Sequence, residues 1–154
     1  MTLRLNFYTA SPDGTKAMLA FENYVAHCGL EESLIELVKM RASQINGCAY
    51  CLDMHSRDAR KRGETEQRLY VLPAWRETEL FNGREKAALA WTEALTLISQ
   101  NHAPDAVYEQ ARAAFTDKEL ADLTLLIGAI NTWNRLAIGF RAPLPVHKVV
   151  AAAH

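Results

Sequence analysis

With 154 residues, of which 49% are hydrophobic, the chain has the size of one domain and enough apolar side chains for one core, which excludes a disordered or collagen-like protein. Its 17 Lys and Arg and 18 Asp and Glu residues leave a formal net charge of −1, which excludes general electrostatic binding to nucleic acid or to an anionic membrane. No apolar stretch approaches the roughly 20 residues that span a bilayer, and residues 1–13 lack the apolar segment of a secretory signal, so we expect a soluble cytoplasmic protein.

The first half of the chain is expected to contain three helices. A turn at Ser11–Gly14 precedes the first, which carries apolar residues at helical spacing and ends near Gly29. The second covers about residues 30–45, where an amphipathic pattern recurs. An Asn-Gly pair at 46–47 then turns the chain into a third helix over about 48–62, which a glycine follows.

A short helix over about 64–71 is expected next, with an interruption after it. Pro73 disfavours a helical conformation at the residue before it, Leu72. We expect the apolar side chains of Tyr70, Leu72 and Trp75 to cluster there. After an Asn-Gly pair that separates this segment from the rest, a helix is expected to extend through Ile98.

Two further helices complete the expected fold, one after Pro104 and a long one after Thr116. With Thr116 as the N-cap, Glu119 falls three residues later, as in a capping box. Residues 120–140 are apolar on nearly every side, so this helix belongs at the centre of the fold or in an interface. The polar residues that interrupt it are Asn131, Asn134 and Arg135. We expect them to make structural hydrogen bonds.

These elements predict an all-α protein that forms a single domain over residues 1–154. Glycine and proline are scarce, at seven and five residues, and helix-forming residues dominate. Alternating β-branched runs, internal repeats and linkers are missing from the sequence.

Two of the three cysteines lie close together, in the sequence Cys48-Ala49-Tyr50-Cys51. In a reducing compartment this spacing is typical of metal binding or thiol redox chemistry. The pair opens the third expected helix, and the unpaired amide groups of a helix N-terminus lower the pKa of a thiol. A separation of three residues brings both sulfurs together, so a reversible disulfide is the natural oxidation product.

A base for these thiols is expected from His55, four residues and one helical turn after Cys51. Glu36 lies on the preceding helix, and a helix-turn-helix of this length would return its carboxylate to the imidazole, which it would orient. The alternative is a solvated Glu36 that is paired with Lys39 or Arg41.

The cysteine pair also supplies half of a tetrahedral zinc site, whose other ligands would come from His27, Cys28 or His55. Because a second CxxC and a closely spaced histidine pair are missing, we expect redox chemistry and no metal, with Cys28 as a buried apolar residue. No phosphate loop and no flavin or nicotinamide fingerprint is present, so we expect no organic cofactor. The remaining histidines, which we expect to be solvated, are His102, His147 and His154.

One spacing joins the groups that carry this chemistry: Glu36, eleven residues, Cys48-Ala49-Tyr50-Cys51, three residues and His55. The pattern resembles the alkylhydroperoxidase D family within the carboxymuconolactone decarboxylase-like superfamily. The other segments that look like this family are residues 41–47, 63–68, 72–76 and 131–135. The resemblance extends over roughly residues 15–141.

The resemblance implies an all-helical thiol peroxidase that assembles as a homo-oligomer, a trimer or a hexamer. In such a hydroperoxide reductase Cys51 would react with the hydroperoxide, and Cys48 would resolve the product as a disulfide. Glu36 and His55 would relay the proton that activates the thiol. A dithiol, the dihydrolipoyl group of a carrier protein, would reset the enzyme.

One position departs from the family pattern. Tyr50 stands where the family has a histidine directly before the second cysteine, and a phenol is a poor base near neutral pH, although it can donate a hydrogen bond as an accessory group. The decarboxylase branch lacks the cysteine pair, which argues against lactone decarboxylation. The alternatives are a redox-sensing or interaction protein that uses the same disulfide and a general thiol-disulfide oxidoreductase.

Overall fold

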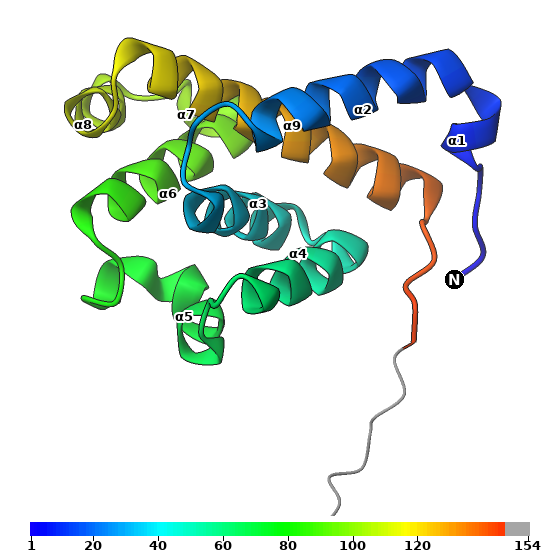
Figure 1. The fold of residues 1–154 in the computed structure, drawn as a ribbon, viewed down its shortest axis with the longest axis horizontal. Helices are drawn as coiled ribbons and strands as arrows, with labels where there is room; N and C mark the ends of the chain where they lie inside the picture. The colour runs from blue at the N-terminus through cyan, green and yellow to red at the C-terminus, as the bar shows by residue number, and fades with distance from the viewer. Residues whose placement is uncertain (147–154) are drawn as a thin grey trace, which may run out of the picture.

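Helices form all the regular structure of residues 1–146, the part of the chain that this computed structural model describes (Figure 1). The elements are α1 (Phe7–Ala10), α2 (Pro12–Ala26), α3 (Glu32–Asn46), α4 (Ala49–Lys61), α5 (Glu66–Val71), the 3₁₀ helix η1 (Leu72–Glu77), α6 (Gly83–Thr96), α7 (Ile98–Asn101), α8 (Asp105–Ala114) and α9 (Asp117–Phe140). The predicted all-α class is confirmed. His102 is exposed, as expected, and His147 and His154 lie outside the described residues.

Helix α1 is an element that the sequence analysis did not predict. The side chain of Asn6 caps it by accepting a hydrogen bond from the Tyr8 amide. Four residues do not form a stable helix alone, so tertiary contacts must hold it. The Phe7 ring supplies them, since it packs 6.3 Å from the Trp133 ring and 6.2 Å from the Phe140 ring of α9.

The segment after α5 corrects two expectations. Leu72 adopts φ −53° and ψ −37°, a right-handed helical conformation, so the expected effect of Pro73 on this residue is wrong. The chain continues from α5 into the tighter 3₁₀ helix η1. Pro73 lies at the start of η1, where the amide hydrogen that proline lacks is not needed for a helical hydrogen bond. The expected apolar cluster is wrong for Tyr70, which is 74% exposed, whereas Leu72 and Trp75 are buried.

Helix α6 ends earlier than expected. It stops at Thr96, and Leu97 then adopts φ −101° and ψ 31°, which separates it from the short α7. Its beginning is well defined because Asn82 and Glu85 form a capping box. The capping box expected from Thr116 and Glu119 at the start of α9 is confirmed.

Helix α3 buries both sides and divides the core into two clusters. Leu34 and Val38 pack toward α2, α6, α8 and α9, whereas Leu37 and Met40 pack toward α4, α5, η1 and α6. Figure 1 shows α3 and α4 side by side, with α9 crossing the fold behind α2. Helix α9 thus has a central position, as expected, but Leu125 on its outer side is exposed. Within residues 1–146, no helix combines the length and the hydropathy needed to cross a bilayer.

Candidate active site

The turn between α3 and α4 positions the cysteine pair. Gly47 ends α3 with φ 68° and ψ 36°, a left-handed conformation that glycine adopts without a steric penalty, and its amide bonds the last turn of α3. The Cys48 amide donates to the Ser43 carbonyl oxygen at 3.0 Å. Cys48 is the N-cap of α4, because its sulfur accepts the Cys51 amide at 3.3 Å. The sequence therefore places both cysteines at the start of a helix.

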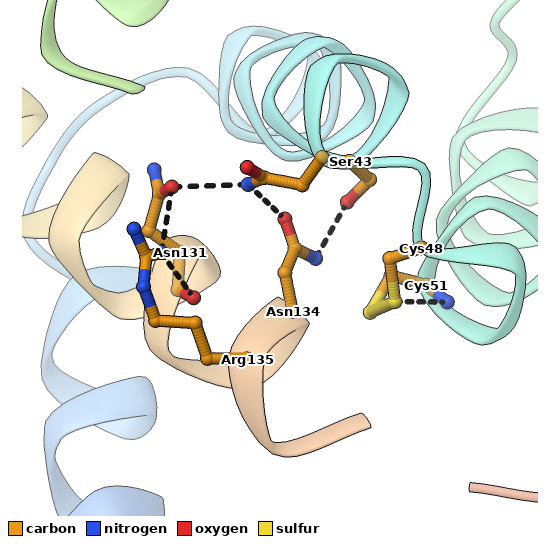
Figure 2. Close-up of a disulfide and its surroundings, with 7 residues drawn as sticks. Ser43, Cys48, Cys51, Asn131, Asn134 and Arg135 are labelled. Carbon is orange, nitrogen blue, oxygen red and sulfur yellow. Dashed lines mark hydrogen bonds between the residues drawn. A yellow bond between two sulfur atoms is a disulfide. The ribbon is translucent and has the colours of Figure 1, made fainter. Parts of the chain in front are cut away.

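The structure has the pair in its oxidised form, with Cys48 and Cys51 joined as a disulfide and their Cα atoms 5.3 Å apart. Figure 2 shows this disulfide at the beginning of α4, facing α9. Cys48 is 1% exposed and Cys51 2% exposed. The pair is thus a buried disulfide at a helix N-terminus, where the free amide groups favour a thiolate after reduction.

The structure brings His55 and Glu36 together. His55 lies one turn beyond Cys51 on α4, and its Nδ1 atom is 3.0 Å from Oε2 of Glu36 on α3. Both residues are buried. If the carboxylate is ionised, Nδ1 carries the proton and donates it, so Nε2 has the lone pair. The arrangement is a cysteine pair followed on the same helix by a buried imidazole that contacts a buried carboxylate.

Sequence reasoning missed Arg62. Its Nη1 atom donates to Oε1 of Glu36 at 2.6 Å, whereas Lys39 and Arg41, the partners considered for Glu36, pair with Glu22 and Glu93. Arg62 is the C-cap of α4 and Glu36 lies near the start of α3, so the antiparallel packing of the two helices brings them together. The signal in the sequence was the position of Arg62 at the C-terminal end of the third expected helix, which follows the helix that contains Glu36.

A polar network links α9 to the end of α3, just before the cysteine turn (Figure 2). Nδ2 of Asn46 donates to Oδ1 of Asn134 at 2.9 Å and to Oδ1 of Asn131 at 3.0 Å. Nδ2 of Asn134 donates to Oγ of Ser43 at 3.0 Å, and Arg135 donates to Asn131. The expected structural hydrogen bonds of Asn131, Asn134 and Arg135 are confirmed.

The other residues that the sequence singled out lie apart from this arrangement or at its edge. Tyr50, in the first turn of α4, is 37% exposed. Cys28 is a partly buried free thiol that packs against the core, and its sulfur donates to the Val25 carbonyl oxygen at 3.2 Å. Among the residues that the structure describes, no group of three or more His, Cys, Asp or Glu side chains is arranged to hold a metal ion.

The sequence profile of the Carboxymuconolactone decarboxylase family matches residues 12–94, which include α3, α4 and the cysteine pair. The chain belongs to this family. Two relatives of uncharacterised function have similar sequences. The uncharacterized protein YdfG of Bacillus subtilis (strain 168) is 44% identical over 138 residues, which cover 90% of this chain and 94% of YdfG. YnjA of Escherichia coli (strain K12) is 30% identical over 102 residues, which cover 66% of this chain and 56% of YnjA.

Solved structures have the same fold. A crystal structure from Agrobacterium tumefaciens matches with a TM-score of 0.92 and 47% identity over 95% of this chain and 100% of that chain. It is described as a protein of unknown function, provisionally an antioxidant defence protein AhpD. The debrominase Bmp8 shares the fold with a TM-score of 0.77 and 15% identity over 90% of this chain and 74% of that chain. The resemblance to the alkylhydroperoxidase D family is confirmed.

Proposed function

We propose that the protein is a dithiol-dependent hydroperoxide reductase. The observation that carries the proposal is an oxidisable Cys48–Cys51 pair at a helix N-terminus, with a buried His55–Glu36 pair one turn further along. The provisional antioxidant role of the Agrobacterium tumefaciens relative supports the same class of chemistry.

The first step consumes the hydroperoxide. Nε2 of His55 takes the proton of the Cys51 thiol, and the thiolate attacks the terminal oxygen of ROOH. The S–O bond forms as the O–O bond breaks, so the sulfur is oxidised to sulfenic acid and the peroxide is reduced to an alkoxide. The imidazolium returns its proton to this alkoxide, which leaves as an alcohol. Glu36 orients the imidazole throughout and stabilises its charged form.

The second step forms the disulfide that the structure contains. The Cys48 thiol attacks the Cys51 sulfenic acid, which forms the S–S bond and releases water. An external dithiol then exchanges with the disulfide, restores both thiols and leaves as its own cyclic disulfide. Two electrons therefore pass from the dithiol to the hydroperoxide in each cycle.

The burial of the disulfide favours slender reactants. A protein disulfide is too bulky to reach sulfurs in residues that are at most 2% exposed, whereas a small hydroperoxide needs only a narrow opening. The dihydrolipoyl group of a carrier protein, a dithiol on a flexible arm, is the reductant that we propose. We propose that the enzyme acts in the cytoplasm as a homo-oligomer, a trimer or a hexamer. Tyr50, at the edge of the site, has an accessory role as a hydrogen-bond donor.

The first test is a count of free thiols in the reduced, denatured protein before and after one equivalent of an organic hydroperoxide. All three cysteines should react before treatment and only Cys28 afterwards, with rapid loss of peroxide. The Cys28→Ser variant should go from two thiols to none. The Cys51→Ser variant should lose turnover. Three thiols after treatment of the unsubstituted chain would refute the proposal.

The same samples test the two alternatives. A disulfide that forms with negligible peroxide turnover and changes the assembly, measured by light scattering in both redox states, would favour a redox sensor. Faster reaction with a small-molecule disulfide than with a hydroperoxide would favour a thiol-disulfide oxidoreductase. We expect neither result, because both sulfurs are buried and His55 lies one turn beyond Cys51 on the same helix.

A further inference from the structure

Arg62 reaches the buried carboxylate of Glu36 from the protein surface. Arg62 is the C-cap residue of α4, and its side chain is 43% exposed. The Glu36 side chain is 6% exposed. The guanidinium divides its donors between two acidic residues of α3: Nη1 lies 2.6 Å from Oε1 of Glu36, and Nε lies 3.1 Å from Oε2 of Glu32. Arg62 therefore pairs with an exposed carboxylate and with a buried one at the same time.

Each oxygen of Glu36 consequently has its own partner. Oε1 accepts from Arg62 and Oε2 contacts His55, so rotation of the carboxylate would break both interactions. A buried carboxylate is stable as an anion only when charged or polar donors replace its lost hydration. Without Arg62, Glu36 would lose its cationic partner and the contact that fixes the plane of its carboxylate.

We propose that Arg62 is a positioning residue for activation of the Cys51 thiol. It holds Glu36 as an oriented anion, Glu36 holds the proton of His55 on Nδ1, and Nε2 is thereby kept ready to accept the thiol proton. The inference rests on the proposed function for its place in turnover. It adds a residue that acts on the thiol only through Glu36 and His55.

The simpler interpretation is that Arg62 only ties α3 to α4 as a surface ion pair. Such pairs contribute little to stability, and α4 offers a matched example in Arg57. The Arg57 side chain is 46% exposed and pairs with Asp53 of its own helix at 2.8 Å. Arg57→Gln therefore removes a similar charge from the same helix without altering the partners of Glu36.

The experiment measures two rates in the reduced full chain: alkylation of Cys51 by iodoacetamide in a Cys28→Ser/Cys48→Ser background, and turnover of an organic hydroperoxide with both active-site cysteines present. Arg62→Gln should lower the alkylation rate and kcat by about tenfold each, with KM unchanged, because one charge-assisted hydrogen bond is lost. Arg62→Lys should recover part of both rates, since it restores the positive charge. Arg57→Gln should stay within about twofold of the parent chain in both.

Glu32→Gln separates positioning from helix tethering. It removes the exposed partner of Arg62 but leaves the Glu36 contact, so alkylation should stay close to the parent rate. Circular dichroism at the assay temperature checks that every variant is folded. Parent-like alkylation in Arg62→Gln, or an equal loss in Arg57→Gln, would overturn the inference. If the parent chain turns over no hydroperoxide but Arg62→Gln still slows alkylation, the proposed function fails and the positioning role stands.

Discussion

Glu36 shows how one side chain couples the surface to the candidate active site. Glu36 is buried, and its carboxylate contacts the His55 imidazole 3.0 Å away and the Arg62 guanidinium 2.6 Å away. A neutral amide of the same shape would preserve the packing of α3 against α4. It would remove the negative charge that stabilises a protonated imidazole, which forms when His55 takes the thiol proton.

We therefore expect Glu36→Gln to lower the rate of Cys51 oxidation by an organic hydroperoxide by about tenfold, and His55→Gln to lower it by about a hundredfold, because general-base catalysis contributes on that order. Stopped-flow measurement of peroxide consumption by the reduced protein provides both values. Glu32→Gln is the control, since Glu32 also pairs with Arg62 but is largely exposed. Equal rates in Glu36→Gln and the parent chain would contradict a role for this carboxylate in catalysis.

At the scale of elements, the cysteine turn is held from two sides. Gly47 sets its backbone direction, and Asn134 of α9 anchors the preceding turn of α3 through Ser43 and Asn46. The Ser43 carbonyl oxygen also accepts the Cys48 amide, so this segment of α3 connects α9 to the N-cap of α4. Figure 2 shows the hydrogen bond between Asn134 and Ser43 and, at the start of the next helix, the Cys48–Cys51 disulfide.

Asn134→Ala should destabilise the fold by about 1–3 kcal/mol, because Asn134 is fully buried and its loss leaves polar groups of Ser43 and Asn46 without that partner. Chemical denaturation of the oxidised protein measures the change. Thr132→Ala is a matched control on the exposed side of α9, where the hydroxyl donates to the Gly128 carbonyl oxygen of its own helix. It should change stability by about 0.5 kcal/mol or less. A similar loss in both variants would show that the Asn134 network adds nothing specific.

The sequence could predict the elements whose ends are defined by nearby residues. The capping box of Thr116 and Glu119 and the turn at Gly47 are local features, and the structure has both where expected. Phe7 of helix α1 packs against α9, and Leu72 at the 3₁₀ continuation lies in a core cluster with residues of α6, and no local pattern encodes such distant contacts.

The candidate site divides in the same way. Cys48, Cys51 and His55 share α4, so helical spacing alone predicts their common location. The spacing of Glu36 allowed two readings, a solvated side chain or a partner of His55, and only the packing of α3 on α4 decides between them. Arg62 was missed because it follows the C-terminus of α4, whereas Glu36 lies near the N-terminus of α3. Only the antiparallel packing of the two helices brings them into contact.

For the whole molecule, three carboxylates connect distant segments and make the fold sensitive to acid. A hydrogen bond from Arg84 of α6, with further bonds from Thr116, lowers the pKa of Glu119 on α9 to about 2. A hydrogen bond from Lys118 lowers the pKa of Asp122, which also accepts from Tyr24 of α2. Burial raises the pKa of Glu93, but bonds from Trp75, Arg76 and Arg41 outweigh it and lower this pKa overall.

The sign of the pH dependence follows from these directions. A carboxyl group whose pKa is lower in the folded than in the unfolded protein stabilises the fold fully above the unfolded value, about 4.3 for glutamate. This stabilisation is lost as the pH falls through the folded value, which is about 2 for Glu119. We therefore expect the free energy of unfolding to decrease steadily from about pH 4.5 to pH 2.

Glu119→Gln isolates one of these contributions, because glutamine at N3 preserves the capping box with Thr116 but not the charge that faces Arg84. At pH 7 the variant should be less stable by about 1 kcal/mol or less, since the pair is partly exposed. The difference should shrink as the pH falls toward 2, where about half of the parent carboxyl groups are protonated. Urea denaturation at pH 7, 4 and 2.5 measures this trend, and Glu109→Gln, at an exposed residue of α8 that pairs with Arg112, is the control with no expected change. A deficit that is independent of pH would mean that the side chain stabilises α9 through its shape and not through its charge.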